Sequence, residues 1–366
     1  MIGLLEMRRR ALQFALVGAI FVLIAYLVLM IDGLGIGLND LAGSAVRRFD
    51  ADAIAFADTA GRSILRSELS AAAVEQARGR TDVVAAGPLA YTAATYRDAG
   101  GAVESAALLG YDPGTIAEPA LLDGRALTPA DRRAVLADRR FLRTAGLHVG
   151  DTVTIEQRLA SVEFEIVGAI DQGAFFFQPA LYALRESVLD LKYGPDNVGR
   201  PAASIILLRG DDLTGSGDGL DIVDKATAFA NIEGVAGQAA TIASLRLLGY
   251  LIGALVIGAF FSVLTLQKVG QIGVLKAVGA SSGFIARQLL AQVLAVALVG
   301  LALALPLALL TDWAIEAGGD VVPIGFTGAS LLTTAVALLV AAVVGALVCV
   351  RQVVRVDPLI ALGQQQ

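Results

Sequence analysis

The sequence predicts an α-helical membrane protein with four transmembrane helices and one inserted extracytoplasmic α+β domain. Apolar residues make up 56% of the chain, and the mean hydropathy is +0.70. Several apolar runs exceed the length of about 18 residues that a membrane-crossing helix needs. Charge is distributed unevenly, because residues 35–244 contain 28 of the 34 acidic residues. A soluble acidic domain is therefore inserted into a membrane protein that is otherwise slightly basic.

The first apolar run follows Arg8, Arg9 and Arg10. It is longer than the apolar part of a signal peptide and lacks a small-residue cleavage site, so we predict an uncleaved first helix. The predicted order along the chain is a cytoplasmic N-terminus at residues 1–11, a first transmembrane helix at 12–34, the extracytoplasmic domain at 35–244, a second helix at 245–266, a cytoplasmic segment at 267–284, a third helix at 285–310, an outer loop at 311–329, a fourth helix at 330–350 and a cytoplasmic tail at 351–366.

The orientation follows from the positive-inside rule. Residues 266–292 contain Lys268, Lys276 and Arg287 but no Asp or Glu, so this segment is predicted to face the cytosol. With four crossings, both chain ends are then predicted to lie in the cytosol. Arg246 is an exception, because it opens the second helix on the outer side. We expect its side chain to extend outward to the membrane surface.

Alternation and turn signals predict the elements of the inserted domain. Strands are expected at residues 52–56, 83–96, 103–109, 152–155, 164–170 and 204–208, and helices at 68–78, 132–145 and 179–191. Residues 222–247 could form a helix that leads into the second span, although Gly234 and Gly237 interrupt it. This mixture predicts an α+β fold. The one cysteine, Cys349, lies in a predicted span, so the domain must be stable without disulfides.

Three glycines at positions 33, 35 and 37 end the first apolar run. They follow no strand, so we interpret them as a helix end or a close helix contact and not as a nucleotide loop. The sequence has no G-x-x-x-x-G-K-[S/T] motif to bind ATP phosphates. Gly249 and Gly253 have the spacing that lets two helices approach closely, and we predict a contact between two copies of the chain there. Such spacing also arises by chance in glycine-rich helices.

Several phrases carry a resemblance to a known family. They are GVLKAVGASSGFIARQLLAQ after the second span, LLGYD at 108–112, VGDTV at 149–153, FEIVG at 164–168 and RVDPLIAL at 355–362. With one span, a large outer domain and three further spans, the chain resembles the MacB/FtsX-type ABC permeases, also called type VII or mechanotransmission transporters. The resemblance implies a MacB-like periplasmic core domain and a place in the cytoplasmic (inner) membrane of a bacterium. Residues 14–37 and the phrase DADAIAFADTAGRS are most similar to HrtB-like haem-exporter and DevC-like permeases.

The resemblance implies that two copies of this chain bind a dimeric ABC ATPase, which binds ATP and Mg and supplies the energy. This chain would be no enzyme, with no catalytic residue, metal or cofactor of its own. The cytoplasmic segment would be the coupling helix, and its expected contact residues are Ile272, Val274, Leu275, Lys276, Ala277 and Val278. Alternatively, this cytoplasmic segment is only a polar connection between two spans and binds no partner.

If haem is the cargo, the outer ends of the first two spans offer ligands. Met30 supplies a soft thioether and Glu233 a carboxylate, which suits an axial pair for haem iron. Arg246 and Tyr250 could neighbour the propionates and the porphyrin. Alternatively, Met30 is a packing residue and Glu233 a solvated acid. The acid Asp32 in the first span is costly unless it is satisfied, which favours a functional role for this region.

Two classes of function follow. In the first, the chain is the permease of an ABC efflux transporter that extrudes an amphiphilic cargo, haem being the best candidate, with lipid, lipoprotein and drug export as alternatives. In the second, it is an FtsX-like regulator that relays ATPase motion to an extracellular hydrolase. The expected partners are the ATPase, a second copy and the lipid bilayer; a membrane-fusion adaptor is left open, and nucleic acid is not expected.

Overall fold

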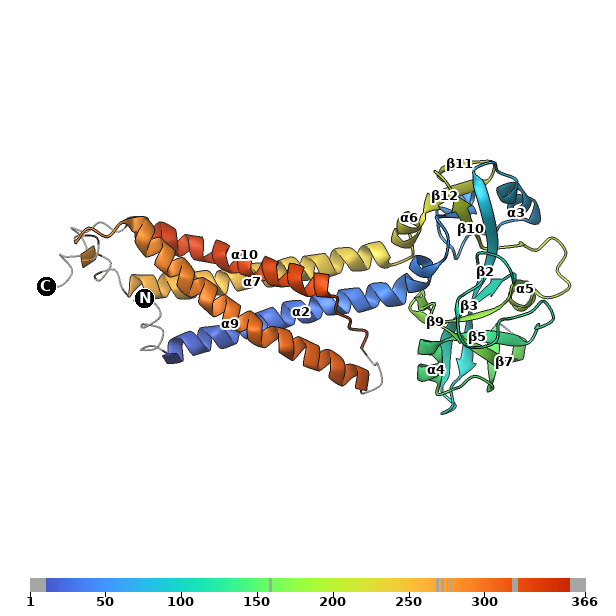
Figure 1. Ribbon diagram of the computed structural model, residues 1–366, viewed down its shortest axis with the longest axis horizontal. Helices are drawn as coiled ribbons and strands as arrows, with labels where there is room; N and C mark the ends of the chain where they lie inside the picture. The colour runs from blue at the N-terminus through green and yellow to red at the C-terminus, as the bar shows by residue number, and fades with distance from the viewer. Residues whose placement is uncertain are drawn as a thin grey trace. The chain divides into compact units, whose positions relative to one another are not determined.

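The computed structural model describes residues 11–157, 160–267, 270, 273, 274, 276, 278–317 and 322–355 (Figure 1). The chain divides into two compact units. The helical unit combines Met1–Gly37 with Ala239–Gln366, and the sheet domain is Leu38–Gln238. The sheet domain is therefore an insertion between the first helix and the remaining ones.

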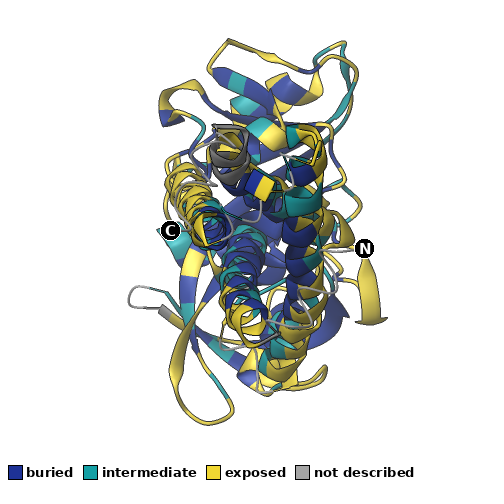
Figure 2. Ribbon diagram, turned by 90° about the vertical axis from the view of Figure 1, so that its left-hand side faces the viewer, coloured by how far each residue is buried: buried dark blue, intermediate teal, exposed yellow. Residues whose placement is uncertain are grey.

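The helical unit is built from long apolar helices. They are α2 (Ala11–Arg48), α7 (Val235–Leu266), α9 (Ser282–Ala317) and α10 (Gly328–Arg355). Within the described ranges, four helices are long and apolar enough to cross a membrane. Their outer faces expose large apolar side chains, for example Leu332, Val336 and Val340 at helical spacing on α10 (Figure 2, yellow). Such uniformly apolar helices are typical of proteins surrounded by lipid.

The helices pack through small residues. A Cβ atom at Gly300 of α9 would lie 2.5 Å from the Phe21 ring of α2. Where α7 and α10 cross, a Cβ atom at Gly258 would lie 2.8 Å from the carbonyl oxygen of Gly345. Lipid tails are as apolar as these side chains, so the hydrophobic effect does not drive the helices together. Close packing of the backbones therefore stabilises their association.

The sheet domain consists of short helices around one large sheet. Its elements are β1 (Ala53–Ala57), η1 (Asp58–Ala60), α3 (Ala71–Arg78), β2 (Val83–Arg97), β3 (Val103–Tyr111), β4 (Leu121–Gly124), β5 (Ala134–Asp138), α4 (Arg139–Ala145), β6 (Thr152–Gln157), β7 (Ala160–Ile170), β8 (Ala174–Phe175), β9 (Gln178–Leu184), α5 (Arg185–Tyr193), β10 (Ile205–Gly210), β11 (Gly215–Gly217), β12 (Leu220–Asp224) and α6 (Lys225–Ala230). The combination of four apolar helices with this inserted domain is the fold class that the sequence predicts.

The strands run in the order β11-β12-β1-β10-β2-β3-β9-β5-β7-β4. All pairs along this path are antiparallel except β3 with β9 and β5 with β7, which are parallel. Strand β6 pairs with both β7 and β2, so β2, β3, β9, β5, β7 and β6 form a closed ring. One apolar core fills this ring, and a second lies between α3 and the strands β1, β10 and β12.

Two segments predicted as helices begin as strands. Residues 132–145 form β5 and then α4, and residues 179–191 form most of β9 and then α5. Both strands lie inside the sheet and are almost entirely buried, so they read as continuous apolar runs without the alternation of a half-exposed strand. The helix α4 begins only after Asp138, whose side chain accepts a hydrogen bond from the N–H of Arg140.

The interpretation of the glycines at 33, 35 and 37 as a helix end is wrong, whereas a close contact is confirmed. Helix α2 continues through them to Arg48. A Cβ atom at Gly33 would lie 2.6 Å from the Phe326 ring, and one at Gly35 would lie 2.8 Å from Ile242. The helix expected at 222–247 is also interrupted, because β12 and α6 precede a turn at Gly234 (φ +89°), after which α7 begins.

Candidate functional sites in the helical unit and at the end of helix α2

The helical unit contains a buried charge pair. Asp32 of α2 has a side chain only 5% exposed, and it forms an ion pair with Arg246 of α7. Its second carboxylate oxygen accepts a hydrogen bond from the hydroxyl of Thr334 on α10 at 2.9 Å. An ionised carboxylate among apolar helices is costly unless it is paired and hydrogen-bonded, and both conditions are met here. The cluster therefore ties three helices of this unit together through one side chain.

Arg246 does not simply extend outward as expected. Its guanidinium is 39% exposed, but it is bound to Asp32. A carboxylate on a cargo molecule would therefore have to compete with Asp32 for Arg246. The partner Thr334 was not predicted, since a threonine in an apolar helix usually bonds its own backbone and gives no signal of a distant contact.

The four residues predicted to contact haem fall into different environments. Met30 and Tyr250 are both partly buried and pack against the apolar cluster of the helical unit, and Arg246 belongs to the same unit. Glu233 belongs to the sheet domain, where it is exposed and accepts a hydrogen bond from the hydroxyl of Ser63. The structure thus supplies a thioether and a phenol in one apolar cluster, and the ligand role of all four residues stays a prediction.

Gly249 and Gly253 are both buried within the single chain. A Cβ atom at Gly249 would lie 2.5 Å from the side chain of Val28 on α2, and one at Gly253 would lie 3.5 Å from Ile24. These glycines therefore let α7 approach α2 of the same chain. A contact with a second copy at this position remains a prediction.

Only part of the predicted coupling segment is described. Ile272, Leu275 and Ala277 lie outside the described residues. Val278 is 84% exposed and Val274 is 45% exposed, and the N–H of Val278 donates to the carbonyl of Val274 at 3.0 Å. Lys276, between them in the sequence, is half-buried. Ser281 then caps α9, because its hydroxyl accepts from the N–H of Phe284 at 3.2 Å.

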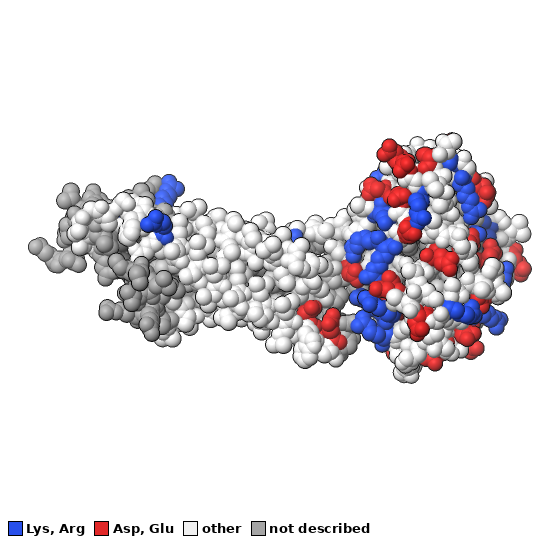
Figure 3. All heavy atoms as spheres, viewed as in Figure 1, with Lys and Arg blue, Asp and Glu red and all other residues white. Residues whose placement is uncertain are grey.

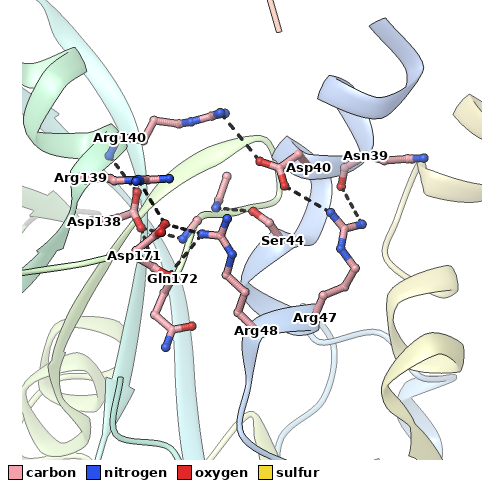
Figure 4. A network of polar contacts seen from close by, with 12 residues as sticks. Asn39, Asp40, Ser44, Arg47, Arg48, Asp138, Arg139, Arg140, Asp171 and Gln172 are labelled. Atoms are coloured by element: carbon pink, nitrogen blue, oxygen red, sulfur yellow. Dashed lines mark hydrogen bonds and ion pairs between the residues drawn. The ribbon is translucent and has the colours of Figure 1, made fainter. Parts of the chain in front are cut away.

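A polar network at the end of α2 was not predicted from the sequence (Figure 4). Arg48 donates to the carboxylate of Asp171 at 2.6 Å, and the Ser44 hydroxyl accepts from the N–H of Ala174 at 2.9 Å. The buried carboxylate of Asp138 accepts from the N–H groups of Gln172 and Gly173 at 2.8 and 2.6 Å. Burial raises the pKa of Asp138 above its ordinary value, while these N–H donors oppose the shift.

Most charged side chains visible in Figure 3 lie on the sheet domain. The middle parts of the long helices show almost none. Among the described residues, no group of three or more His, Cys, Asp or Glu side chains could hold a metal ion. The features that can act chemically are thus the Asp32 cluster, the thioether of Met30 and the network at the end of α2.

Comparison with known proteins places the C-terminal helices in a family. Residues 243–358 match the FtsX-like permease C-terminal family. A protein of Staphylococcus haemolyticus named as a hemin transport system permease, HrtB, is 25% identical over 224 residues, which are 59% of this chain and 60% of that protein. An uncharacterized ABC transporter permease of Mycobacterium bovis is 29% identical over 290 residues, or 77% of this chain and 75% of that protein.

Among solved structures, the periplasmic region of MacB from Actinobacillus actinomycetemcomitans is similar to this chain with a TM-score of 0.36 and 17% identity. The matched part covers 51% of this chain and 94% of the MacB region. The extracellular domain of the transporter YknZ has a TM-score of 0.34 and 13% identity, covering 48% of this chain and all of that domain. The likeness to permeases depends on the family match at residues 243–358 and on the permease relatives, and not on these two solved structures. Residues 243–358 thus match the FtsX-like permease C-terminal family, and the chain as a whole is similar to ABC transporter permeases.

Proposed function

We propose that this chain is the membrane subunit of an ABC efflux transporter that a separate ATPase drives, and that it extrudes an amphiphilic cargo, haem being the best candidate. The observation that carries the proposal is the match of residues 243–358 to the FtsX-like permease family. The similarity to HrtB, a relative named for hemin transport, supports haem as the cargo. Because this match spans 60% of HrtB, the cargo belongs to the proposal and not to the family assignment.

The ATPase is proposed to bind the segment at residues 267–284 in the cytosol of a bacterial cell, with both chain ends on the same side. The exposed apolar residues Val274 and Val278 support a docking role. Apolar side chains of this kind can insert into a groove of a partner protein. Two copies of the chain would then bind two ATPase subunits.

The cargo route is proposed to pass the cluster around Met30 and Tyr250. Haem is flat and apolar except for its iron and two carboxylates, so a site for it needs an apolar wall, a soft ligand and a cation. Met30 and Tyr250 lie in the apolar cluster of the helical unit, and Arg246 is a cation of that unit. We infer that the cargo carboxylates displace Asp32 from Arg246 during transport. Glu233, which belongs to the sheet domain, stays a predicted ligand.

The test is an absorption titration of the purified complex with haem. Met30→Ala and Glu233→Ala should each lose or shift the Soret band that the unmodified protein shows. The matched controls are Leu27→Ala, which truncates an exposed apolar residue of α2, and Glu118→Ala, which removes an acid of the sheet domain; both should retain the band. An unchanged band in both test variants would exclude Met30 and Glu233 as ligands.

The same complex separates transport from regulation. ATP-dependent loss of haem from proteoliposomes supports the exporter. If ATP is hydrolysed but no haem moves, and an added cell-wall hydrolase becomes active instead, the FtsX-like regulator is the correct function. Export of a lipid, lipoprotein or drug in place of haem would retain the permease role and change the cargo.

A further inference from the structure

Four arginines surround the last turns of α2 within the sheet domain. Arg47 and Arg48 are the last residues of α2, and Arg139 and Arg140 are the first residues of α4. Their side chains are between 31% and 61% exposed. We call these four residues the arginine patch. All of them belong to one compact unit, so the patch is defined by contacts within that unit alone.

The first carboxylate in the patch is Asp40 of α2. It forms an ion pair with Arg47 at 3.3 Å and a longer one with Arg140 at 3.8 Å (Figure 4). One carboxylate therefore serves two guanidinium groups. A guanidinium has five N–H donors, so each of these arginines can bind a further anion while it keeps its contact with Asp40.

The second carboxylate is Asp171, and it also serves two arginines. It forms ion pairs with Arg48 at 2.6 Å and with Arg139 at 3.3 Å. The two residues that follow it donate their N–H groups to the buried carboxylate of Asp138, which fixes the position of the segment. Even with Asp138 counted as ionised, the four arginines outnumber the three carboxylates. The patch therefore carries a net positive charge.

The stability of α4 does not explain why arginines stand at its start. A cation in the first turn of a helix lies at the positive end of the helix dipole, which is unfavourable. The helix nevertheless begins with Arg139 and Arg140, directly after its capping residue Asp138. An anion bound by these arginines would offset that unfavourable position.

The chain connection places the patch near the membrane surface. Residues 12–34 are the predicted first span, and Asp40 follows Leu34 by six residues of the same helix. At 1.5 Å per residue, Asp40 lies at most about 9 Å beyond the predicted end of the hydrocarbon. The headgroup layer on each side of a bilayer is about 5–8 Å thick. Arg47 and Arg140 contact Asp40, so their guanidinium groups lie at the edge of this layer.

An exposed aromatic ring lies at the same level. Phe177 is 41% exposed, and its N–H donates to the carbonyl of Leu41, the residue after Asp40, at 2.9 Å. Its φ angle is 62°, a region that bulky L-residues avoid. Such a conformation persists only where the surrounding contacts hold it in place. The surroundings thus hold an apolar ring at the surface of the domain, beside the patch.

We propose that the arginine patch binds the phosphate groups of anionic lipids, with the ring of Phe177 inserted among the headgroups beside it. Arginine suits this role because its planar guanidinium binds two phosphate oxygens through parallel hydrogen bonds. Phe177 favours a lipid over a soluble anion, since aromatic rings are enriched at the membrane–water interface. The interaction needs neither an ATPase nor a cargo, so it goes beyond the proposed function and depends only on the predicted first span.

The first experiment counts the lipids that the full chain retains. The protein is purified in detergent, incubated with equal amounts of phosphatidylglycerol and phosphatidylcholine, and weighed by native mass spectrometry. The unmodified chain should retain phosphatidylglycerol in preference. In the variant Arg139→Gln with Arg140→Gln this preference should fall about fivefold or more, because each lost arginine weakens the attraction of anionic headgroups.

The matched control is Arg78→Gln with Arg132→Gln. These arginines of the sheet domain are 40% and 63% exposed, and each forms an ion pair with one carboxylate. Arg132 precedes β5 and Arg139 follows it, so the two lie at opposite ends of that strand. The control should keep the preference, and Arg139→Lys with Arg140→Lys should keep part of it, since lysine retains the charge but not the paired hydrogen bonds. An equal preference in the unmodified chain and the Gln variant of the patch would overturn the proposal, and so would an equal loss in that variant and the control.

The second experiment locates Phe177 in a bilayer and leaves the arginines intact. The one tryptophan is first removed by Trp313→Phe, so that Phe177→Trp supplies the fluorescence. In nanodiscs whose lipids are brominated near the headgroup, this fluorescence should be strongly quenched. Val198→Trp is the control, at a position 97% exposed in the loop between α5 and β10, and it should stay unquenched. Equal emission of Phe177→Trp in brominated and ordinary lipid would overturn the membrane contact.

Discussion

Asp32 shows how one residue can decide the packing of a membrane protein. Its carboxylate contacts Arg246 and Thr334, so its two oxygens bind two different helices besides its own. The pair depends on Arg246, because without it the carboxylate of Asp32, which is 5% exposed, would be buried without a compensating charge. Asp32, Arg246 and Thr334 therefore stabilise the helices together, as one polar cluster.

Replacing Asp32 by Ala should destabilise the helical unit. We expect a loss of about 2–3 kcal/mol, at the lower end of values for broken buried pairs because Arg246 is partly exposed. Thermal unfolding in detergent measures the change. The double variant Asp32→Leu with Arg246→Leu should recover most of the stability, and Thr334→Val should cost about 1 kcal/mol. Equal losses in the single and double variants would show that the ion pair does not couple these positions.

Asp131 gives the sheet domain a dependence on pH. Its carboxylate binds Arg125 through two hydrogen bonds of 2.8 Å and also accepts from Thr128, and these contacts hold the pKa of Asp131 well below its usual range. Because the folded pKa is depressed, the stabilisation is present above about pH 4, near the pKa of an unfolded Asp, and is lost as the pH falls toward the folded pKa.

The unmodified protein should therefore lose thermal stability between about pH 4 and pH 2 more steeply than Asp131→Asn. Circular dichroism of the full chain during heating measures this. Arg125→Gln should also make the loss of thermal stability with falling pH less steep, since it removes the guanidinium that binds the carboxylate of Asp131. Parallel profiles for all three proteins would show that this pair does not control acid stability.

At the scale of the elements, close helix crossings determine the arrangement of α7 and α10. A Cβ atom at Gly345 would lie 2.8 Å from the backbone carbon of Ala254, and it would also collide with the Ala254 oxygen. The backbones touch at this crossing, so no rotamer change can relieve the collision. The spacing of glycines along the sequence does not reveal which of them face another helix.

Gly345→Val should force α7 and α10 apart. Overpacking of this kind typically costs about 1–3 kcal/mol, and we expect a value at the upper end because backbone atoms must move. Unfolding in detergent checks the effect. Gly18→Val, at a position of α2 where a Cβ atom meets nothing within 4 Å, should change stability little. A similar loss in both variants would attribute the effect to glycine replacement in general.

At the scale of the whole molecule, the proposed function needs a contact with the ATPase on the side predicted to be cytoplasmic. The segment that contains Val274 and Val278 is proposed to make this contact. Lys276→Asp should abolish stimulation of the ATPase, because it replaces a cation by an acid in a segment that has no Asp or Glu. ATP hydrolysis by the purified complex measures this.

The control for that experiment is Thr327→Asp. Thr327 caps α10, since its hydroxyl accepts from the N–H of Ser330 at 3.1 Å, and aspartate caps helices equally well. This variant also introduces an aspartate, in a different loop, and should leave stimulation intact. If Lys276→Asp stimulates the ATPase as well as the control does, the coupling role of this segment is wrong.

The sequence by itself determined the class of the protein, because long apolar runs and the segregation of acidic residues at positions 35–244 are properties of composition. It also predicted six of the twelve strands in the described part of the chain, namely β1, β2, β3, β6, β7 and β10. Only the tertiary structure decided that α2 continues into the sheet domain, that residues 132–145 and 179–191 begin as strands, and that Asp32 binds Arg246 and Thr334. These features depend on contacts between residues far apart in the chain, and a local pattern carries no information about the partner that buries it.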